Sequence, residues 1–269
     1  HLSIRRQRQM CIRDRIYTVK ENRMETITLT LDNIEKEHIC CAMSAKDNQA
    51  TSKKEWLKER IQEGLVFTKL NERGKCFIEY IPIEKAWIHL TGKDYMYINC
   101  LWVSGKFQGH GYAKELLKKC ILDSQAKGKK GLVILSSPKK KSFLMDYDFL
   151  IKQGFYSVDK WNEEYELLFY PFEDGQPAPK FMIEDVKEDG LVLYYTHQCP
   201  FNIKYVQEIK EYCIKQNIPL TIHHLQTREQ ALQAPTPMTT YSLFYQKKFM
   251  TREVLNVRKL EKIWSEIHE

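Results

Sequence analysis

The sequence lacks several features that would place it in a specialised structural class. No apolar run approaches the roughly 18–20 residues that a membrane-spanning helix needs, so no membrane association is expected. Glycine and proline are sparse, at 11 and 9 of 269 residues, and there is no collagen-like or low-complexity repeat. Hydrophobic residues make up 43% and charged residues 29%, which excludes intrinsic disorder. What is left is a globular protein of one or two domains.

The eight cysteines also lack the spacing of a metal site. No two of them form the C-x₂₋₄-C pair typical of structural zinc, and no secretory signal with an apolar segment is present. Cys76, Cys100 and Cys120 lie within apolar patterns, as reduced core thiols do. We therefore expect a cytoplasmic protein without a metal ion.

The formal charge of +7 is unevenly distributed. Residues 1–15 contain five Arg and one Asp, and residues 1–23 supply five of the seven units. This segment has no helical or strand periodicity, and residues 10–15 resemble the translation of a sequencing-library adapter. We interpret residues 1–23 as an assembly artefact or a disordered tail, with a natural start at Met24; a basic nucleic-acid-binding arm is the alternative. The nearly neutral remainder argues against a nucleic-acid partner.

An acidic stretch with glycine and proline, residues 173–185, is expected to link two domains. Apolar periodicity in residues 24–172 predicts a mixed α/β layer with a central sheet. Its strands are expected near 26–31, 65–70, 75–81, 95–103, 132–135, 155–158 and 164–170, and its helices near 33–41, 52–63 (capped by Ser52), 111–127 and 142–153. Residues 186–269 form a smaller α/β domain, with strands expected near 191–195, 220–225, 241–245 and 249–251 and helices near 202–216 and 253–267.

A strand–loop–helix segment carries the clearest chemical signal. Leu101 and Val103 end an expected strand, and Gly109 and Gly111 lie in the loop before the helix. Glycines let backbone N–H groups approach an anion closely, and a helix N-terminus favours negative charge. The loop matches neither the Walker A pattern nor G-x-G-x-x-G. These residues predict a cradle for a phosphate or pyrophosphate.

The segment QGHGYA resembles the Q/R-x-x-G-x-G/A signature of the GNAT acetyltransferases, with Gln108, Gly111 and Ala113 at the defining positions. The order of elements in residues 24–172 is also similar to that family. The resemblance implies the GNAT mixed central sheet flanked by helices, with acetyl-CoA as co-substrate. In that family, strand residues pair with the pantetheine arm and loop amides hold the pyrophosphate. The cofactor-binding residues implied here are Leu101, Trp102, Val103, Gln108, Gly109, His110, Gly111, Tyr112 and Ala113.

Lysines surround this loop in the sequence. Coenzyme A carries a pyrophosphate and a 3′-phosphate, so we expect some of these lysines to neutralise it. The alternative for each one is a solvated basic surface. The set comprises Lys106, Lys114, Lys118, Lys119, Lys139, Lys140 and Lys141.

The catalytic groups are less clearly defined. The family's usual tyrosine, a general acid for the leaving thiolate, falls at Leu150, and Tyr147 is one helical turn earlier. Candidate bases for the acceptor amine are His38, Glu79 and His110. We select Tyr147 and Glu79 as candidate catalytic residues. The acceptor is expected to be an amine on an unidentified small molecule or peptide.

Residues 186–269 resemble the thioredoxin/glutaredoxin fold in their order of elements. Cys199 occupies the place of that family's active cysteine, and Pro237 that of its cis-proline. A thiol next to a helix N-terminus has a lowered pKa, which makes Cys199 a candidate reactive thiol. Asn202 replaces the second cysteine, so a dithiol oxidoreductase is not expected. Together with the GNAT part, the segments YYTHQCPF and APTPMTTYSLFY are similar to the YoaP-like acetyltransferases.

Three functions follow from these features. The first is an acetyl-CoA-dependent N-acetyltransferase with an appended thioredoxin-like domain. The second is a single-cysteine thiol protein in which Cys199 reacts and the GNAT domain regulates. The third is a non-catalytic acyl-CoA-binding protein, favoured by Leu150 at the usual tyrosine position. The sequence leaves the oligomeric state open.

Overall fold

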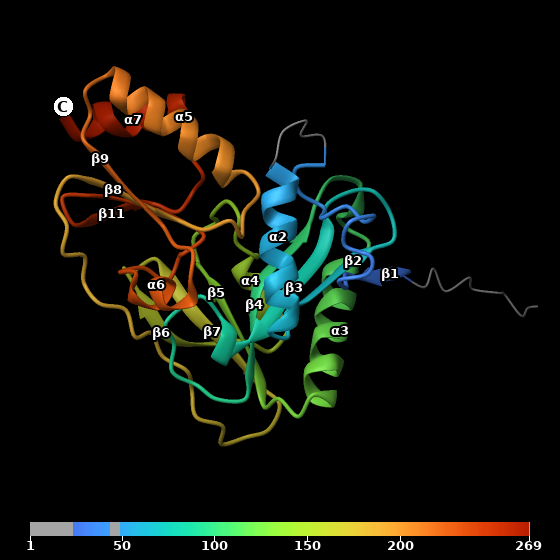
Figure 1. Ribbon diagram of the computed structural model, residues 1–269. Coiled ribbons are helices and arrows are strands. Elements are labelled where there is room, and N and C mark those ends of the chain that lie inside the picture. The colour runs from blue at the N-terminus through green and yellow to red at the C-terminus, as the bar shows by residue number, and fades with distance from the viewer. Residues whose placement is uncertain (1–23, 44–48, 269) are drawn as a thin grey trace, which may run out of the picture.

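The computed structural model describes residues 24–43 and 49–268. The interpretation of residues 1–23 therefore lies outside the described residues. Two β-sheets organise the chain, and the C-terminal elements, orange and red in Figure 1, lie to one side of the first sheet. No helix in the described ranges is long and apolar enough to cross a bilayer.

The first sheet has seven strands in the order β1-β2-β3-β4-β5-β7-β6. Every neighbouring pair is antiparallel except β4 and β5, which run parallel. β5 is buried along its whole length, as a strand covered on both faces must be. The strands are β1 (Thr26–Thr28), β2 (Val66–Leu70), β3 (Cys76–Pro82), β4 (Tyr95–Val103), β5 (Gly131–Ser136), β6 (Tyr156–Trp161) and β7 (Tyr165–Pro171).

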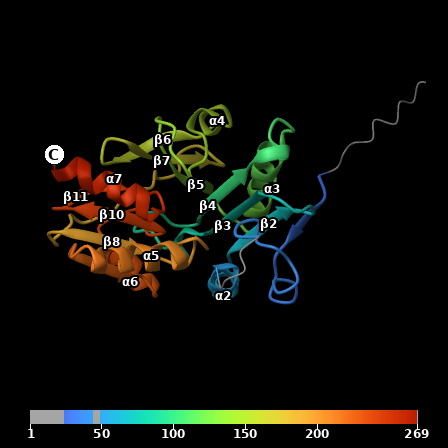
Figure 2. The same cartoon turned by 90° about the horizontal axis from the view of Figure 1, so that it is seen from above.

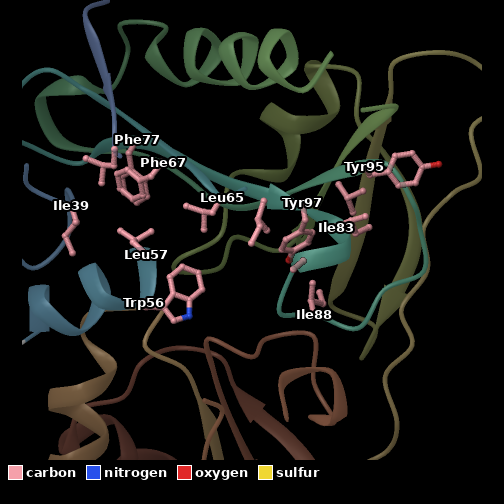
Figure 3. Close-up of a cluster of buried hydrophobic side chains, with 14 of the residues drawn as sticks. Ile39, Trp56, Leu57, Leu65, Phe67, Phe77, Ile83, Ile88, Tyr95 and Tyr97 are labelled. Carbon is pink, nitrogen blue, oxygen red and sulfur yellow. The ribbon is translucent and has the colours of Figure 1, made fainter. Parts of the chain in front are cut away.

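Helices cover both faces of this sheet (Figures 1 and 2). α3 (Tyr112–Ala126) buries Leu116, Leu117 and Cys120 against one face, together with the short α4 (Tyr147–Lys152). α2 (Gln49–Gln62) lies over the opposite face. Figure 3 shows its Trp56 side chain beneath the strands, in one cluster with aromatic residues of β2 and β3.

The second sheet has the order β11-β10-β8-β9. β8 (Leu191–Tyr195) and β9 (Leu220–His224) are parallel. β10 (Tyr241–Tyr245) pairs antiparallel with β8, and β11 (Lys248–Thr251) pairs antiparallel with β10. α5 (Asn202–Lys215) and α7 (Val257–His268) share one apolar cluster with these strands, and α6 (Arg228–Gln233) packs in another. The described residues contain no cis peptide bond, so the bond before Pro237 is trans.

The two sheets are joined through the segment that precedes β4. Trp87 belongs to the same buried cluster as Val192 and Tyr194 of β8. The Thr239 hydroxyl donates a buried hydrogen bond of 2.7 Å to the Trp87 carbonyl, and Arg228 Nε donates to the Ala86 carbonyl at 3.1 Å. The C-terminal part is therefore packed directly against the first sheet.

Residues 173–185, the expected linker, are hydrogen-bonded to β4 and to the segment that precedes it. The Tyr95 hydroxyl donates to the Pro177 carbonyl at 2.6 Å, and Leu90 and Phe181 form an antiparallel bridge. Apart from this bridge, the segment has no regular secondary structure. The division into domains at these boundaries stays a prediction.

Three local predictions are wrong. Residues 33–41 form turns instead of a helix, and Cys40 has a left-handed φ of 61°, which a right-handed helix does not accommodate. α2 begins at Gln49, so Ser52 lies inside the helix and its hydroxyl bonds to the Gln49 carbonyl. The helix expected from residue 142 begins only at Tyr147, because the Asp146 side chain caps it.

Candidate active site

β4 and β5 pair along only part of their length. Residues 95–98 pair with residues 131–134, and beyond Ile98 the partner of β4 is β3 alone. The β3–β4 register shifts between Glu79 and Tyr80, so Asn99 is an extra residue in β4. A bulge bends the strand that carries it. One edge of residues 101–103 therefore faces an opening in the sheet.

An open groove of about 860 Å³ occupies this opening and continues to the N-terminus of α3. Eight of the nine predicted cofactor residues line it, as does Tyr147. The exception is His110, whose ring stacks on Tyr112 with centroids 5.7 Å apart. The eight are Leu101, Trp102, Val103, Gln108, Gly109, Gly111, Tyr112 and Ala113.

The loop before α3 forms a set of unpaired donors. Within the described part of the chain, the backbone N–H groups from Gly109 to Lys114 donate to no residue. Gly109 and Gly111 have left-handed φ values of 79° and 77°, which turn the chain so that successive amides face outward. The α3 dipole adds positive potential at the same place. These groups fit a diphosphate, including the amide of His110, whose side chain points elsewhere.

Three of the lysines expected to meet phosphate line the groove: Lys114, Lys140 and Lys141. Lys141 is also bound to Glu164 at 2.6 Å. Lys106 pairs with Glu72 instead. The positive charge at the groove therefore comes from both its walls, α3 and the loop after β5.

Tyr147 lies at the start of α4, on the groove wall. Its hydroxyl donates to the Glu166 carboxylate at 2.7 Å, and Lys160 pairs with that carboxylate at 3.0 Å. Burial, followed by the bond to Glu166, raises the pKa of Tyr147 to about 12. The phenol therefore keeps its proton at neutral pH. Leu150 is fully buried and takes no part in the groove.

Glu79 is buried on β3, only 2% exposed. Its Oε2 accepts a 2.7 Å hydrogen bond from Lys53 Nζ, and its Oε1 accepts a 2.9 Å bond from Asn99 Nδ2. Each oxygen keeps a second lone pair, since a carboxylate offers about four acceptor positions. The bulge residue of β4 and a lysine of α2 thus hold one carboxylate in place.

A second cavity, of about 110 Å³, lies between the first sheet and the C-terminal part. It shares Trp102 and Phe143 with the groove, so the two spaces meet at these side chains. Trp102 and Phe143 stack with ring centroids 5.9 Å apart. The structure brings Glu79 and Cys199 together on this cavity's wall, whereas Tyr147 lies on the groove side.

The expected low pKa of Cys199 is wrong. Burial raises the pKa of this thiol, and the backbone hydrogen bonds from Phe201 and Asn202 offset only part of that effect. Cys41 and Cys100 line the same cavity, and burial raises the pKa of each thiol as well. Lys53 and Arg252 also favour the Cys199 thiolate, but burial outweighs them, so the thiol stays protonated and reacts slowly.

We therefore predict slow alkylation at these three positions. At pH 7, Cys199 should react with iodoacetamide no faster than free cysteine, because its thiolate fraction is smaller, and its rate should rise as the pH rises. Peptide mass spectrometry after timed labelling, with free cysteine as the reference, measures this. Labelling of Cys199 ahead of the reference would restore the low-pKa interpretation.

Sequence reasoning missed four residues at these spaces: Lys53, Asn99, Phe143 and Arg252. Lys53, Phe143 and Arg252 lie far from the motif at Gln108 along the chain, and Asn99 lies in the strand just before it, but none of them gives a local pattern. In the described ranges, no group of three or more His, Cys, Asp or Glu residues is arranged to hold a metal ion.

Comparison with known proteins places the chain. The Acetyltransferase (GNAT) family matches residues 31–140, and the YoaP-like family matches residues 219–262. The uncharacterized N-acetyltransferase YoaP of Bacillus subtilis (strain 168) is 38% identical over 243 residues, covering 88% of this chain and 97% of that protein. The chain is a GNAT-family N-acetyltransferase with a YoaP-like region.

Solved GNAT structures resemble the first part of the chain more distantly. The GNAT family N-acetyltransferase YhbS from Escherichia coli, in complex with CoA, is 11% identical, with a TM-score of 0.40; the match covers 58% of this chain and 88% of that one. A GNAT acetyltransferase from Brucella melitensis, in complex with acetyl-CoA, is 13% identical, with a TM-score of 0.37; the match covers 57% of this chain and 92% of that one. The seven-stranded mixed sheet is the GNAT-like part of this chain, and the YoaP-like match falls within the second sheet and the elements around it.

Proposed function

We propose that this chain transfers the acetyl group of acetyl-CoA to the amine of a small acceptor. One observation carries the proposal: the groove that begins at the unpaired amides before α3 leads to a cavity with a buried carboxylate. GNAT relatives crystallised with CoA or acetyl-CoA support the choice of co-substrate.

In this proposal, the amides from Gly109 to Ala113 bind the pyrophosphate, and Lys114 and Lys140 add charge. The open edge of residues 101–103 hydrogen-bonds the pantetheine arm. The thioester then lies where groove and cavity meet, beside Trp102 and Phe143. Holding both reactants at this junction makes the transfer effectively intramolecular.

The chemistry needs one base and one acid. The acceptor nitrogen bonds to the thioester carbon, the carbon–sulfur bond breaks, the nitrogen loses a proton, and the sulfur gains one. Glu79 faces the acceptor cavity and is the proposed base, directly or through water. Tyr147 lines the groove and is the proposed acid, after its hydroxyl turns from Glu166 toward the sulfur.

Replacing Tyr147 with Phe tests the acid. We expect kcat to fall by roughly thirtyfold, less than the ~100-fold or more typical of general acids, because the hydroxyl must first leave Glu166. The acetyl-CoA dissociation constant should stay unchanged. Because the pKa of Tyr147 is about 12, the wild-type enzyme should lose no activity through Tyr147 ionisation up to pH 9. A Tyr147→Phe variant with wild-type kcat would remove the residue from the mechanism.

The first test of the proposed function measures both acetyl-CoA binding and acetyl transfer to amines. Isothermal titration calorimetry of the full chain should show acetyl-CoA binding, and mass spectrometry should show acetylated products from an amine panel. If acetyl-CoA does not bind, the proposed function fails. Binding without acetylation of any amine would instead favour the acyl-CoA-binding alternative.

The C-terminal part has the proposed role of closing the acceptor site. The sheet order β11-β10-β8-β9, with β8 and β9 parallel, supports a thioredoxin-like arrangement of residues 186–269. The loop before α5 supplies Cys199 to the cavity wall as a packing side chain. The seven free thiols in the described ranges support a cytoplasmic location.

A further inference from the structure

One charged side chain of the YoaP-like region reaches both small cavities near the junction. Arg252 follows β11 directly and lines the 110 Å³ cavity as well as a neighbouring one of about 50 Å³. The two cavities also share Asn99, Cys100 and Phe143. The two cavities therefore form one continuous acceptor region, and Arg252 lies on the wall that the C-terminal part of the chain supplies.

The Arg252 guanidinium has no acidic partner. Its one hydrogen bond in the described part of the chain runs from Nη1 to the Ser142 carbonyl at 3.1 Å, and its buried Nε has none. The adjacent Glu253 is bound instead to Lys259 at 2.9 Å. Burial lowers the pKa of Arg252, yet an arginine keeps its charge in proteins. The side chain is half-buried, and with its buried Nε unpartnered and no acidic partner in the described ranges, this cation has hydrogen-bond donors left for a ligand.

The walls of the two cavities carry more positive than negative charge. The larger cavity carries Lys53, Lys75 and Arg252 against the single carboxylate of Glu79, which Lys53 already neutralises. Arg252 supplies the charge on the wall of the smaller cavity. The indole N–H of Trp102 is a further buried donor without a partner. A neutral or cationic acceptor would leave the positive charge of Arg252 without a counter-charge.

We infer that Arg252 binds an anionic group of the acceptor, so that the substrate is a small amine carrying a carboxylate or a phosphate. The inference rests on the proposed function and names its acceptor class. A guanidinium presents its N–H groups in a fork that matches the oxygens of either group. The cavities, of about 110 and 50 Å³, are smaller than the ~300–1,000 Å³ of pockets for drug-sized ligands, which favours a small molecule over a peptide.

The placement of charges also sets the orientation of the acceptor. Glu79 and Arg252 line the same cavity, the first from β3 and the second from the C-terminal part. An acceptor with its anion on Arg252 therefore presents its amine to the side of Glu79 and the thioester. The YoaP-like region would thus select the substrate while the GNAT sheet performs the transfer.

Matched pairs of amines test this with the full chain. Each of the 20 or so common L-amino acids is compared with its α-amide, and phosphoethanolamine with ethanolamine, using mass spectrometry of the products. Wild-type enzyme should prefer the anionic member of at least one pair, and that pair identifies carboxylate or phosphate. Arg252→Gln should lower kcat/KM for that member on the order of thirtyfold, mainly through KM, and leave its neutral counterpart unchanged. Arg252→Lys should recover part of the loss.

Two controls separate this inference from folding and from the proposed function. Arg258→Gln removes an exposed arginine of α7 and should change neither preference nor KM. Arg252→Gln should leave unchanged both the acetyl-CoA dissociation constant, measured by calorimetry, and the circular dichroism spectrum. Equal use of both members of every pair by the wild type overturns the inference, while acetyl-CoA binding and turnover keep the proposed function intact. An equal loss for both members in Arg252→Gln also overturns it.

Discussion

Replacing Gly111 with Leu should weaken acetyl-CoA binding by roughly 150-fold. Gly111 holds a φ of 77° at the N-terminus of α3, among amides that no residue in the described ranges accepts from. A side chain there stands where the pyrophosphate approaches. If two charge-assisted hydrogen bonds of about 1.5 kcal/mol each are lost, the affinity falls by about 3 kcal/mol. Calorimetry with acetyl-CoA measures the change directly.

Gly128 provides a matched control at the other end of α3. It also has a left-handed φ, 67°, and a Cβ at either glycine would meet no atom within 4 Å. Gly128→Leu therefore carries a similar backbone strain, of about 1–2 kcal/mol, without touching the groove. Similar melting temperatures for the two variants, with affinity lost only in Gly111→Leu, are expected. Equal affinities in both variants would refute the cradle.

Most of the predicted cofactor-binding residues come together on the groove wall because they are close in the sequence. The strand that ends at Val103, the paired glycines and the apolar face of α3 lie within one continuous segment, and each follows from spacing alone. The boundaries of β3, β4 and α3 agree with the structure to within a residue or so. Local chemistry of this kind needs no knowledge of the rest of the fold.

The acceptor region was harder to predict from the sequence, because residues that are distant along the chain form it. Lys53 comes from α2, Asn99 from a bulge in β4, and Arg252 from the turn after β11. Glu79 was selected from its place on a strand, but its partners were not, since pairing across 26 residues leaves no periodic signal. Cys199 shows the opposite error: its position before α5 suggested a reactive thiol, whereas tertiary burial outweighs the helix terminus.

In the proposed function, the C-terminal part closes the acceptor region, which gives a single chain a use for both the GNAT sheet and the YoaP-like region. In this proposal the GNAT sheet binds acetyl-CoA mainly through backbone groups, and these groups do not discriminate between acceptors. Side chains from a second sheet add walls and charge at the junction without altering the groove. The hydrogen bond from Arg252 to Ser142 links the acceptor side to the loop that carries Phe143 and the groove lysines.

Glu79→Gln should lower kcat roughly 1,000-fold while the acetyl-CoA dissociation constant stays unchanged. Glutamine keeps the size of the side chain and an oxygen for Lys53, but it cannot take the acceptor proton. The variant also leaves the Lys53 ammonium buried without its counter-charge, which costs about 3 kcal/mol or more of stability. Urea unfolding and steady-state kinetics separate the two effects, provided that assays run below the unfolding transition.

The double variant Lys53→Met/Glu79→Gln distinguishes chemistry from stability. Removing both charges of a buried pair restores most of the stability that removing one of them loses, because no uncompensated ion remains. We therefore expect the double variant to unfold near the wild-type urea concentration and yet to stay as inactive as Glu79→Gln. If activity returns with stability, Glu79 only supports the fold and the base lies elsewhere. If activity stays lost, the Glu79 carboxylate is needed for removal of the proton, directly or through water, and the ion pair with α2 serves to hold it at the acceptor cavity.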